Sequence, residues 1–324
     1  MGISIRIEFH LHVSRTERKD TPSEHQPATA QTGTGFLAEA NSLVERLKPT
    51  LSPSTIGNYS TALRSLKAYL GRDIVVGQLD QQTFKGFERW LLDKQVCLNT
   101  VSCYMRSLRS LLRRLCGAEG SKAFGSVYTG RAKTEKRAVG EADIASLKAV
   151  RLKASSFACL VRDLFLFSFY ALGMPFVDLA FLRKSQIRDG QLVYQRHKTG
   201  QRIVVRLEPC MTEIINRYQT DDTDYVFPLI RSADADKAYR EYQQKLGAYN
   251  RALKQLAKEA GIESRLTSYT PRHTWASIAF SHNVDLPVIS KGLGHANPHT
   301  TLTYIRQIND NRLEEANRSI LQNI

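Results

Sequence analysis

Residues 269–275 read Tyr-Thr-Pro-Arg-His-Thr-Trp, and residues 292–295 read Gly-Leu-Gly-His. The Thr-Pro pair is typical of an N-cap followed by the first helical position, which places Arg272 in the first turn of a helix. An arginine is poorly placed there for the helix dipole, but a bound anion such as phosphate would favour both the arginine and the helix N-terminus. In the second stretch a glycine ends a helix and leaves His295 on the connection, and Tyr304 follows nine residues later.

A β-hairpin is predicted upstream of these motifs. Two short strands, Leu-Val-Tyr-Gln-Arg at 192–196 and Arg-Ile-Val-Val at 202–205, flank a turn that reads His-Lys-Thr-Gly at 197–200. Lys198 stands at its tip. A lysine in a β-turn is usually a solvated charge, so the hairpin alone does not indicate a site.

Helical periodicity dominates residues 36–116 and predicts a compact unit of four helices. The predicted helices lie near 38–47, from the Ser52 cap to Gly71, from Asp80 onwards, and from an Asn99 cap to about 116. Residues 1–35 precede this unit, with strict alternation typical of a strand over 3–13 and a Ser-, Thr-, Gln- and Pro-rich flexible segment after it.

The positive charge belongs to the predicted folded body. The chain has 46 Lys and Arg against 31 Asp and Glu, a formal net charge of +15 that is typical of proteins that bind nucleic acid. Residues 1–35 are neutral, whereas residues 36–137 hold 17 basic and 8 acidic side chains, or +9. In the helix that starts near Asn99 the leucines share one face, and the opposite face carries Arg106, Arg109 and Arg113. We expect this face to contact DNA; the alternative is a basic face that only meets solvent.

A second domain is predicted over 138–324, joined to the first by a linker over 117–137 that is rich in Gly, Ser and basic residues. It begins with helices near 141–150 and 157–172. The final residues, 309–324, have helical spacing and are expected to dock either on a neighbouring subunit or on their own domain.

Several protein classes are excluded by composition. No run of 18 apolar residues exists, so no membrane span or membrane partner is expected, and the N-terminus lacks the pattern of a secretory signal. The five cysteines form no C-x-x-C pair, which indicates reduced thiols in an intracellular, cytoplasmic protein without a structural metal.

Together these motifs resemble the tyrosine recombinase, or phage integrase, family. The resemblance rests on Lys198 in a hairpin, the 269–274 motif, Leu-Gly-His at 293–295 and Tyr304, in that order. Residues 167–179 resemble the family's first motif, and 36–116 its core-binding domain. The resemblance implies a mainly α fold with a small β-hairpin or sheet, in which the helical core-binding domain precedes a mixed α+β catalytic domain.

The function implied by the resemblance is site-specific recombination of DNA, by integration, excision or inversion. Tyr304 would attack a DNA phosphorus to give a 3′-phosphotyrosine, and Lys198 would protonate the leaving 5′-oxygen. Arg272 and His295 would hold the non-bridging oxygens. No cofactor, metal or ATP is expected. The partners would be double-stranded DNA carrying a specific recombination site and other copies of the chain in a synaptic tetramer.

Two positions depart from the family pattern. Tyr269 stands where a histidine usually precedes the arginine by three residues, and it can still donate a hydrogen bond to phosphate. Pro175 stands where the family's first arginine follows the Gly-hydrophobic pair, and a proline offers no donor. We expect another cation to take that place: Arg196, which shares a strand face with Lys198, is favoured over Arg162, and no substitute at all is the alternative.

An alternative function is therefore a DNA-binding accessory protein of the same fold with impaired catalysis. The proline favours this alternative. The joint presence of Lys198, Arg272, His295 and Tyr304 favours an active recombinase, because a decayed site would not be expected to keep four scattered groups.

Overall fold

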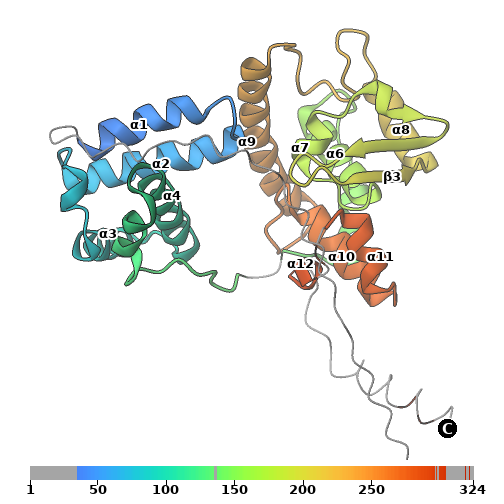
Figure 1. Cartoon of the computed structure of the whole chain (residues 1–324). Helices are drawn as coiled ribbons and strands as arrows, with labels where there is room; N and C mark the ends of the chain where they lie inside the picture. Colours follow the sequence, from blue (N-terminus) through green and yellow to red (C-terminus); the bar gives the residue numbers. More distant parts are fainter. Residues whose placement is uncertain are drawn as a thin grey trace, which may run out of the picture. The chain divides into compact units, whose positions relative to one another are not determined.

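The computed structural model describes residues 35–134, 137–295, 297, 299–303, 318 and 321 (Figure 1). The chain divides into two compact units, Met1–Lys133 and Thr134–Ile324. The strand predicted over 3–13, Tyr304 and nearly all of the predicted 309–324 helix lie outside the described residues.

The first unit is helical. Its elements are α1 (Phe36–Leu47), α2 (Pro53–Leu70), η1 (Val76–Gln78), α3 (Gln81–Asp93), α4 (Leu98–Cys116) and η2 (Gly117–Phe124). The predicted helix starts at Ser52 and Asp80 are confirmed, since each side chain accepts a backbone N–H of the first turn. Gly71 ends α2 in the left-handed conformation.

The segment after α4 differs from the predicted linker. Residues 117–124 form η2, which packs on α4, and Ser102 Oγ donates to the Gly130 carbonyl at 2.6 Å. The N-cap of α4 is Cys97; the amide of Asn99 instead exchanges two hydrogen bonds with the backbone of Ala132, at 2.9 and 3.1 Å. The chain therefore stays attached to the first unit as far as Ala132.

The second unit is mainly helical with one small sheet. Its elements are α5 (Glu141–Ala149), α6 (Phe157–Tyr170), α7 (Phe176–Ala180), η3 (Lys184–Gln186), β1 (Ile187–Arg188), β2 (Gln191–Gln195), β3 (Arg202–Arg206), α8 (Pro209–Tyr218), α9 (Ala235–Glu259), α10 (Thr270–Ser281), α11 (Leu286–Leu293) and α12 (His299–Leu302). The sheet is antiparallel in the order β1-β2-β3, and β2 and β3 form the predicted hairpin. The predicted fold class is confirmed.

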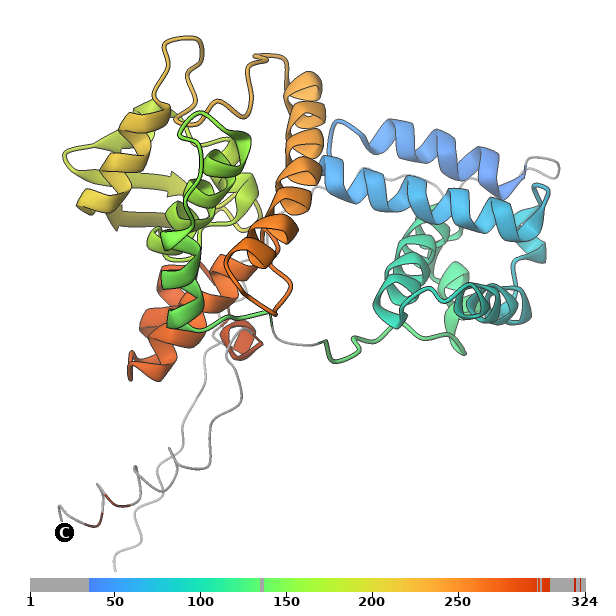
Figure 2. The same cartoon turned by 180° about the vertical axis from the view of Figure 1, so that it is seen from behind.

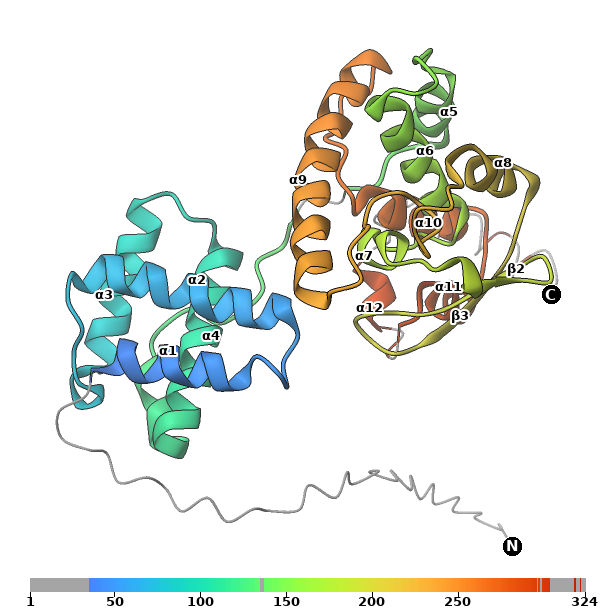
Figure 3. The same ribbon diagram turned by 90° about the horizontal axis from the view of Figure 1, so that it is seen from above.

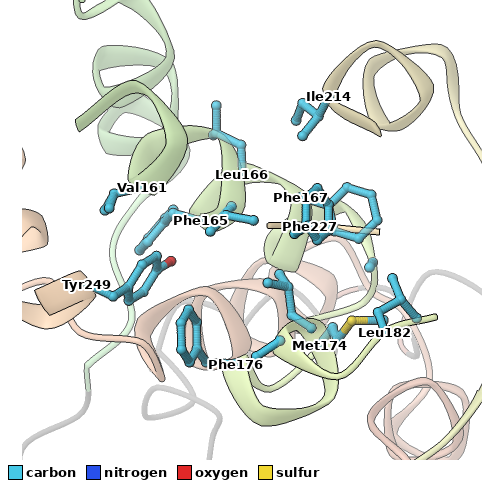
Figure 4. Close-up of a cluster of buried hydrophobic side chains, with 14 of the residues drawn as sticks. Val161, Phe165, Leu166, Phe167, Met174, Phe176, Leu182, Ile214, Phe227 and Tyr249 are labelled. Atoms are coloured by element: carbon cyan, nitrogen blue, oxygen red, sulfur yellow. The ribbon is translucent and has the colours of Figure 1, made fainter. Parts of the chain in front are cut away.

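Helix α6 forms the centre of this unit and packs against α5, α8, α9 and α10 (Figure 3). The sheet and α9 lie at opposite sides of the unit (Figure 2). Figure 4 shows the core, where Phe167 meets Phe227 edge-on at 5.0 Å and the Phe176 ring lies 4.4 Å from that of Tyr249. Each such buried ring contributes roughly 1.5–3 kcal/mol. This packing fixes the ends of α6, α7 and α10, from which the candidate site is built.

Candidate active site

Arg272 lies in the first turn of α10, as predicted, and its side chain is buried, with 1% exposed. The helix begins one residue earlier than expected: Tyr269 is the N-cap, because the hydroxyl of Thr270 instead accepts the N–H of Thr267 at 2.9 Å. Arg272 Nη1 donates to the Gly173 carbonyl at 3.1 Å, and Nη2 donates to the Leu293 carbonyl. The guanidinium thus joins the turn after α6 to the end of α11.

Gly173 is required where it approaches Arg272. Its φ is +69°, and an added Cβ would lie 2.7 Å from Arg272 Cα, closer than real Cβ atoms come to other atoms. Pro175, at the position of the missing family arginine, is the N-cap of α7. This turn, where the resemblance predicts an arginine, instead accepts a hydrogen bond from Arg272 at its Gly173 carbonyl.

His295 follows the left-handed Gly294 that caps α11, as predicted, and its ring lies beside Arg272. Its Nε2 is 3.0 Å from Arg272 Nη2, and its Nδ1 is 2.9 Å from Thr301 Oγ1. Burial, followed by the charges of Arg272, Arg196 and Lys198, lowers the pKa of His295 to about 4. The imidazole is therefore neutral at physiological pH.

Arg196 belongs to the same cluster, but it is directed inward. It is buried, with 5% exposed, and its Nη1 donates to the carbonyls of Leu293 at 2.9 Å and Gly294 at 3.3 Å. Arg196 and Arg272 consequently donate to the same carbonyl, that of Leu293, two residues before His295. The replacement of the missing arginine by Arg196 remains a prediction; the structure places the Arg196 guanidinium on the Leu293 and Gly294 carbonyls.

Asp178 on α7 is the acidic partner of this cluster. Its Oδ2 lies 3.7 Å from Arg196 Nε, and its Oδ1 accepts the backbone N–H of His197 at 2.8 Å. Burial raises the pKa of Asp178, while the His197 N–H and the Arg196 charge act in the opposite direction. Asp178 thereby holds the base of the turn that carries Lys198.

Lys198 is exposed on that turn, which the Gly200 N–H closes by donating to the Arg196 carbonyl at 2.8 Å. Tyr269, predicted to take the place of a family histidine, is half-buried, and its ring lies edge-on to that of His273 with 5.6 Å between centroids. Arg272 and His295 thus contact each other directly, and Arg196 is joined to Arg272 through the shared Leu293 carbonyl. Lys198 acts on His295 through its charge, and Tyr269 is the N-cap of the helix that carries Arg272.

Comparison with known proteins agrees with this arrangement. The Phage integrase family matches residues 149–311, about half of the chain, and the Phage integrase SAM-like domain matches residues 35–114. The chain belongs to the phage integrase family. The curated relatives that match the chain are named tyrosine recombinases.

Two relatives and one solved structure give the extent of the likeness. Tyrosine recombinase XerD of Listeria monocytogenes serotype 4b is 25% identical over 266 residues, covering 78% of this chain and 88% of the relative. Tyrosine recombinase XerA of Pyrococcus furiosus is 30% identical over 174 residues, covering 51% of this chain and 57% of the relative. A lambda integrase tetramer bound to a Holliday junction matches with a TM-score of 0.64 at 14% identity, covering 88% of this chain and 83% of that one; this likeness concerns the fold.

Arg162, the other cation considered for the place of the missing arginine, makes its contacts elsewhere in the second unit. Its Nε donates to Asp163 at 2.9 Å and its Nη1 donates to the Val150 carbonyl at 2.8 Å. Asp163 is buried and also accepts from Arg217 and from the Tyr218 hydroxyl. Arg162 therefore belongs to a structural ionic network in the body of the unit.

The arginines predicted to contact DNA lie on α4 of the first unit. Arg106 and Arg113 are exposed and Arg109 is partly exposed, whereas Met105 and Leu108 of the same helix are buried. Arg106 Nε also donates to the carbonyl of Ser102 at 3.2 Å. The predicted amphipathic arrangement is present.

Sequence reasoning missed two residues that the structure brings into the cluster. Asp178 stands inside the 167–179 motif, three positions after Pro175. A single carboxylate among apolar residues is the feature of the sequence that could have identified it. Thr301 is one of several threonines before Tyr304, and nothing in the sequence singles it out.

Within the described ranges, no group of three or more His, Cys, Asp or Glu side chains could hold a metal ion. In the same part of the chain, no helix is both long and apolar enough to span a membrane.

Proposed function

We propose that this integrase is an active site-specific recombinase that cuts and rejoins double-stranded DNA through a 3′-phosphotyrosine at Tyr304. The observation that carries the proposal is that Arg272 and Arg196 donate to the same Leu293 carbonyl, while His295 lies 3.0 Å from Arg272. Three nitrogen-rich side chains gathered at the end of one helix make a site that favours a phosphodiester.

In the proposed reaction the Tyr304 oxygen bonds to phosphorus as the bond from phosphorus to the 5′-oxygen breaks. Lys198, exposed on its turn, gives a proton to the leaving 5′-oxygen, and a 5′-hydroxyl of a second strand later reverses the step. A tyrosine has an ordinary pKa near 10, so its attack at neutral pH needs the surrounding positive charge or a proton acceptor. The phosphotyrosine conserves the bond energy, and the reaction needs no ATP.

We assign Arg272 and His295 to the non-bridging oxygens, where negative charge grows in the transition state. Tyr269 would add a hydroxyl donor beside them. Arg196 would supply the positive charge that Pro175 does not, and two observations support this: it shares the Leu293 carbonyl with Arg272, and its charge helps to lower the pKa of His295. Asp178 would keep Arg196 and the Lys198 turn in place.

The proposed partners are a DNA duplex with a specific recombination site and further copies of this chain. The lambda integrase with the same fold forms a tetramer on a Holliday junction, and we propose the corresponding assembly here, in the cytoplasm. Arg106, Arg109 and Arg113 would contact DNA phosphates from the first unit.

A catalytically impaired accessory protein is the second candidate, favoured by Pro175 at the place of a catalytic arginine. Covalent capture separates the two. The protein is incubated with a library of nicked duplexes cut from the DNA that flanks its own gene, and adducts that survive denaturing washes are sequenced. A recombinase yields covalent adducts enriched for one sequence; an accessory protein enriches a sequence without any covalent adduct.

A further inference from the structure

Thr301 makes a contact that the proposed chemistry does not yet use. It lies on the four-residue α12, is completely buried at 0% exposed, and its Oγ1 is 2.9 Å from His295 Nδ1. The other ring nitrogen, Nε2, is 3.0 Å from Arg272 Nη2. Both nitrogens of His295 are therefore engaged, one by Thr301 and one by Arg272.

These partners determine the protonation of the ring. A guanidinium only donates hydrogen bonds, so Nε2 of His295 has to accept from Arg272. A neutral imidazole carries one proton, which then resides on Nδ1 and is donated to the Thr301 hydroxyl. In this arrangement His295 has no Nε2 proton to offer to a phosphate.

The reaction requires the opposite arrangement at Nε2, because a phosphate oxygen accepts hydrogen bonds. His295 reaches it by moving its proton from Nδ1 to Nε2 or by gaining a second proton. Burial of the ring, followed by the positive charges of Arg272, Arg196 and Lys198, lowers the pKa of His295 and so disfavours the second route. In the first route Nδ1 becomes an acceptor and needs a donor facing it.

We propose that Thr301 is a positioning residue whose hydroxyl accepts from His295 Nδ1 in the DNA-free enzyme and donates to it once Nε2 turns from Arg272 to the phosphate. A hydroxyl can do both, whereas a carboxylate only accepts and an aliphatic side chain does neither. The second half of this statement rests on the proposed function. The first half concerns the free protein alone.

Three variants separate the hydrogen bond from packing. Thr301→Val removes the hydroxyl at nearly the same shape, and Thr301→Ser keeps the hydroxyl but loses the methyl group. Thr300→Val is the matched control, because Thr300 is exposed on the same short helix.

The DNA-free state is tested by nitrogen NMR of the full chain labelled on histidine, at neutral pH, with the His295 signals assigned by their loss in His295→Gln. We expect a protonated Nδ1 and an unprotonated Nε2 in the wild type and in Thr300→Val, and a changed ratio of tautomers in Thr301→Val. A wild-type His295 protonated on Nε2, or on both nitrogens, would overturn the proposal.

The DNA-bound state is tested by the rate of covalent cleavage at saturating nicked DNA. Thr301→Val should be slower by about ten- to a hundredfold, the equivalent in rate of leaving one buried polar group without its partner, while DNA affinity changes less than about threefold. Thr301→Ser should recover most of the rate. Equal losses in the Val and Ser variants would assign Thr301 to packing and contradict the proposal.

The two measurements also separate this inference from the proposed function. A wild-type protein with the Nδ1–H tautomer that cleaves no DNA would contradict the proposed function and still confirm the Thr301 contact in the free protein. A protein that cleaves DNA but carries the His295 proton on Nε2 when free would support the proposed function and contradict the Thr301 contact.

Discussion

Replacing Gly173 by alanine tests how closely the turn after α6 holds Arg272. The added Cβ would lie 2.7 Å from Arg272 Cα and 3.2 Å from its Cβ, and the clash with the backbone atom cannot be relieved by rotating a side chain. The residue also has a φ of +69°. Two costs therefore add, one from the backbone conformation and one from the contact.

The cost of the backbone conformation and the cost of the contact can be separated by comparing Gly173 with Gly190. A left-handed conformation costs a non-glycine residue about 1–2 kcal/mol, and overpacking a buried contact costs a further 1–3 kcal/mol or so. Gly190 has nearly the same φ, +68°, but an added Cβ there meets nothing within 4 Å. Gly190→Ala should therefore show the first cost alone, and Gly173→Ala both.

The assay is denaturant unfolding of the full chain, followed through the transition of the second unit, with the cleavage rate measured on the same preparations. Gly173→Ala should lose about 1–3 kcal/mol more unfolding free energy than Gly190→Ala. It should also lose cleavage, because Arg272 moves, while specific DNA binding is kept. Equal destabilisation and equal activity in the two variants would refute the idea that Gly173 seats Arg272.

Two further predictions concern the arginines. A triple variant replaces Arg106, Arg109 and Arg113 of α4 by glutamine, and it should flatten the slope of log binding constant against log salt concentration by about 2–3, at about 0.9 per phosphate contact. Neutralising Lys48, which is already paired with Glu45, is the control and should change the slope by less than 1. An unchanged slope in the triple variant would mean that this face only meets solvent. Arg196→Ala should slow covalent cleavage at saturating DNA by about 10²-fold. Arg162→Ala should lower thermal stability and leave the cleavage rate of the folded protein unchanged. Full activity in Arg196→Ala would refute the proposal that Arg196 replaces the missing arginine.

The helical framework was predictable wherever the signal was local. Ser52 and Asp80 cap the helices that immediately follow them, so a few consecutive residues contain the whole interaction. Asn99 has the same capping chemistry, but its amide pairs with Ala132, 33 residues away, and the helix starts at Cys97 instead. The linker prediction was too long for the same reason, since its attachment to the first unit depends on contacts distant in sequence.

The candidate site shows the same limit. The motif residues Arg272 and His295 were identified by order and spacing, and the structure brings them within hydrogen-bonding distance. The inward direction of Arg196 depends on the Leu293 carbonyl and on Asp178, neither of which is near it in sequence. Thr301 was not predictable because its importance comes entirely from the orientation of one imidazole ring.

The most direct test of the account is the identity of the residue that becomes linked to DNA. Wild-type protein and Tyr304→Phe are reacted with a nicked duplex that traps the covalent intermediate, and the DNA-linked peptide is sequenced by mass spectrometry. We predict one adduct, on Tyr304 through a 3′-phosphate, and no adduct from the Phe variant, which should bind the same DNA within a few fold. An adduct that persists in Tyr304→Phe, or that maps to Tyr269 or Tyr194, would contradict the account.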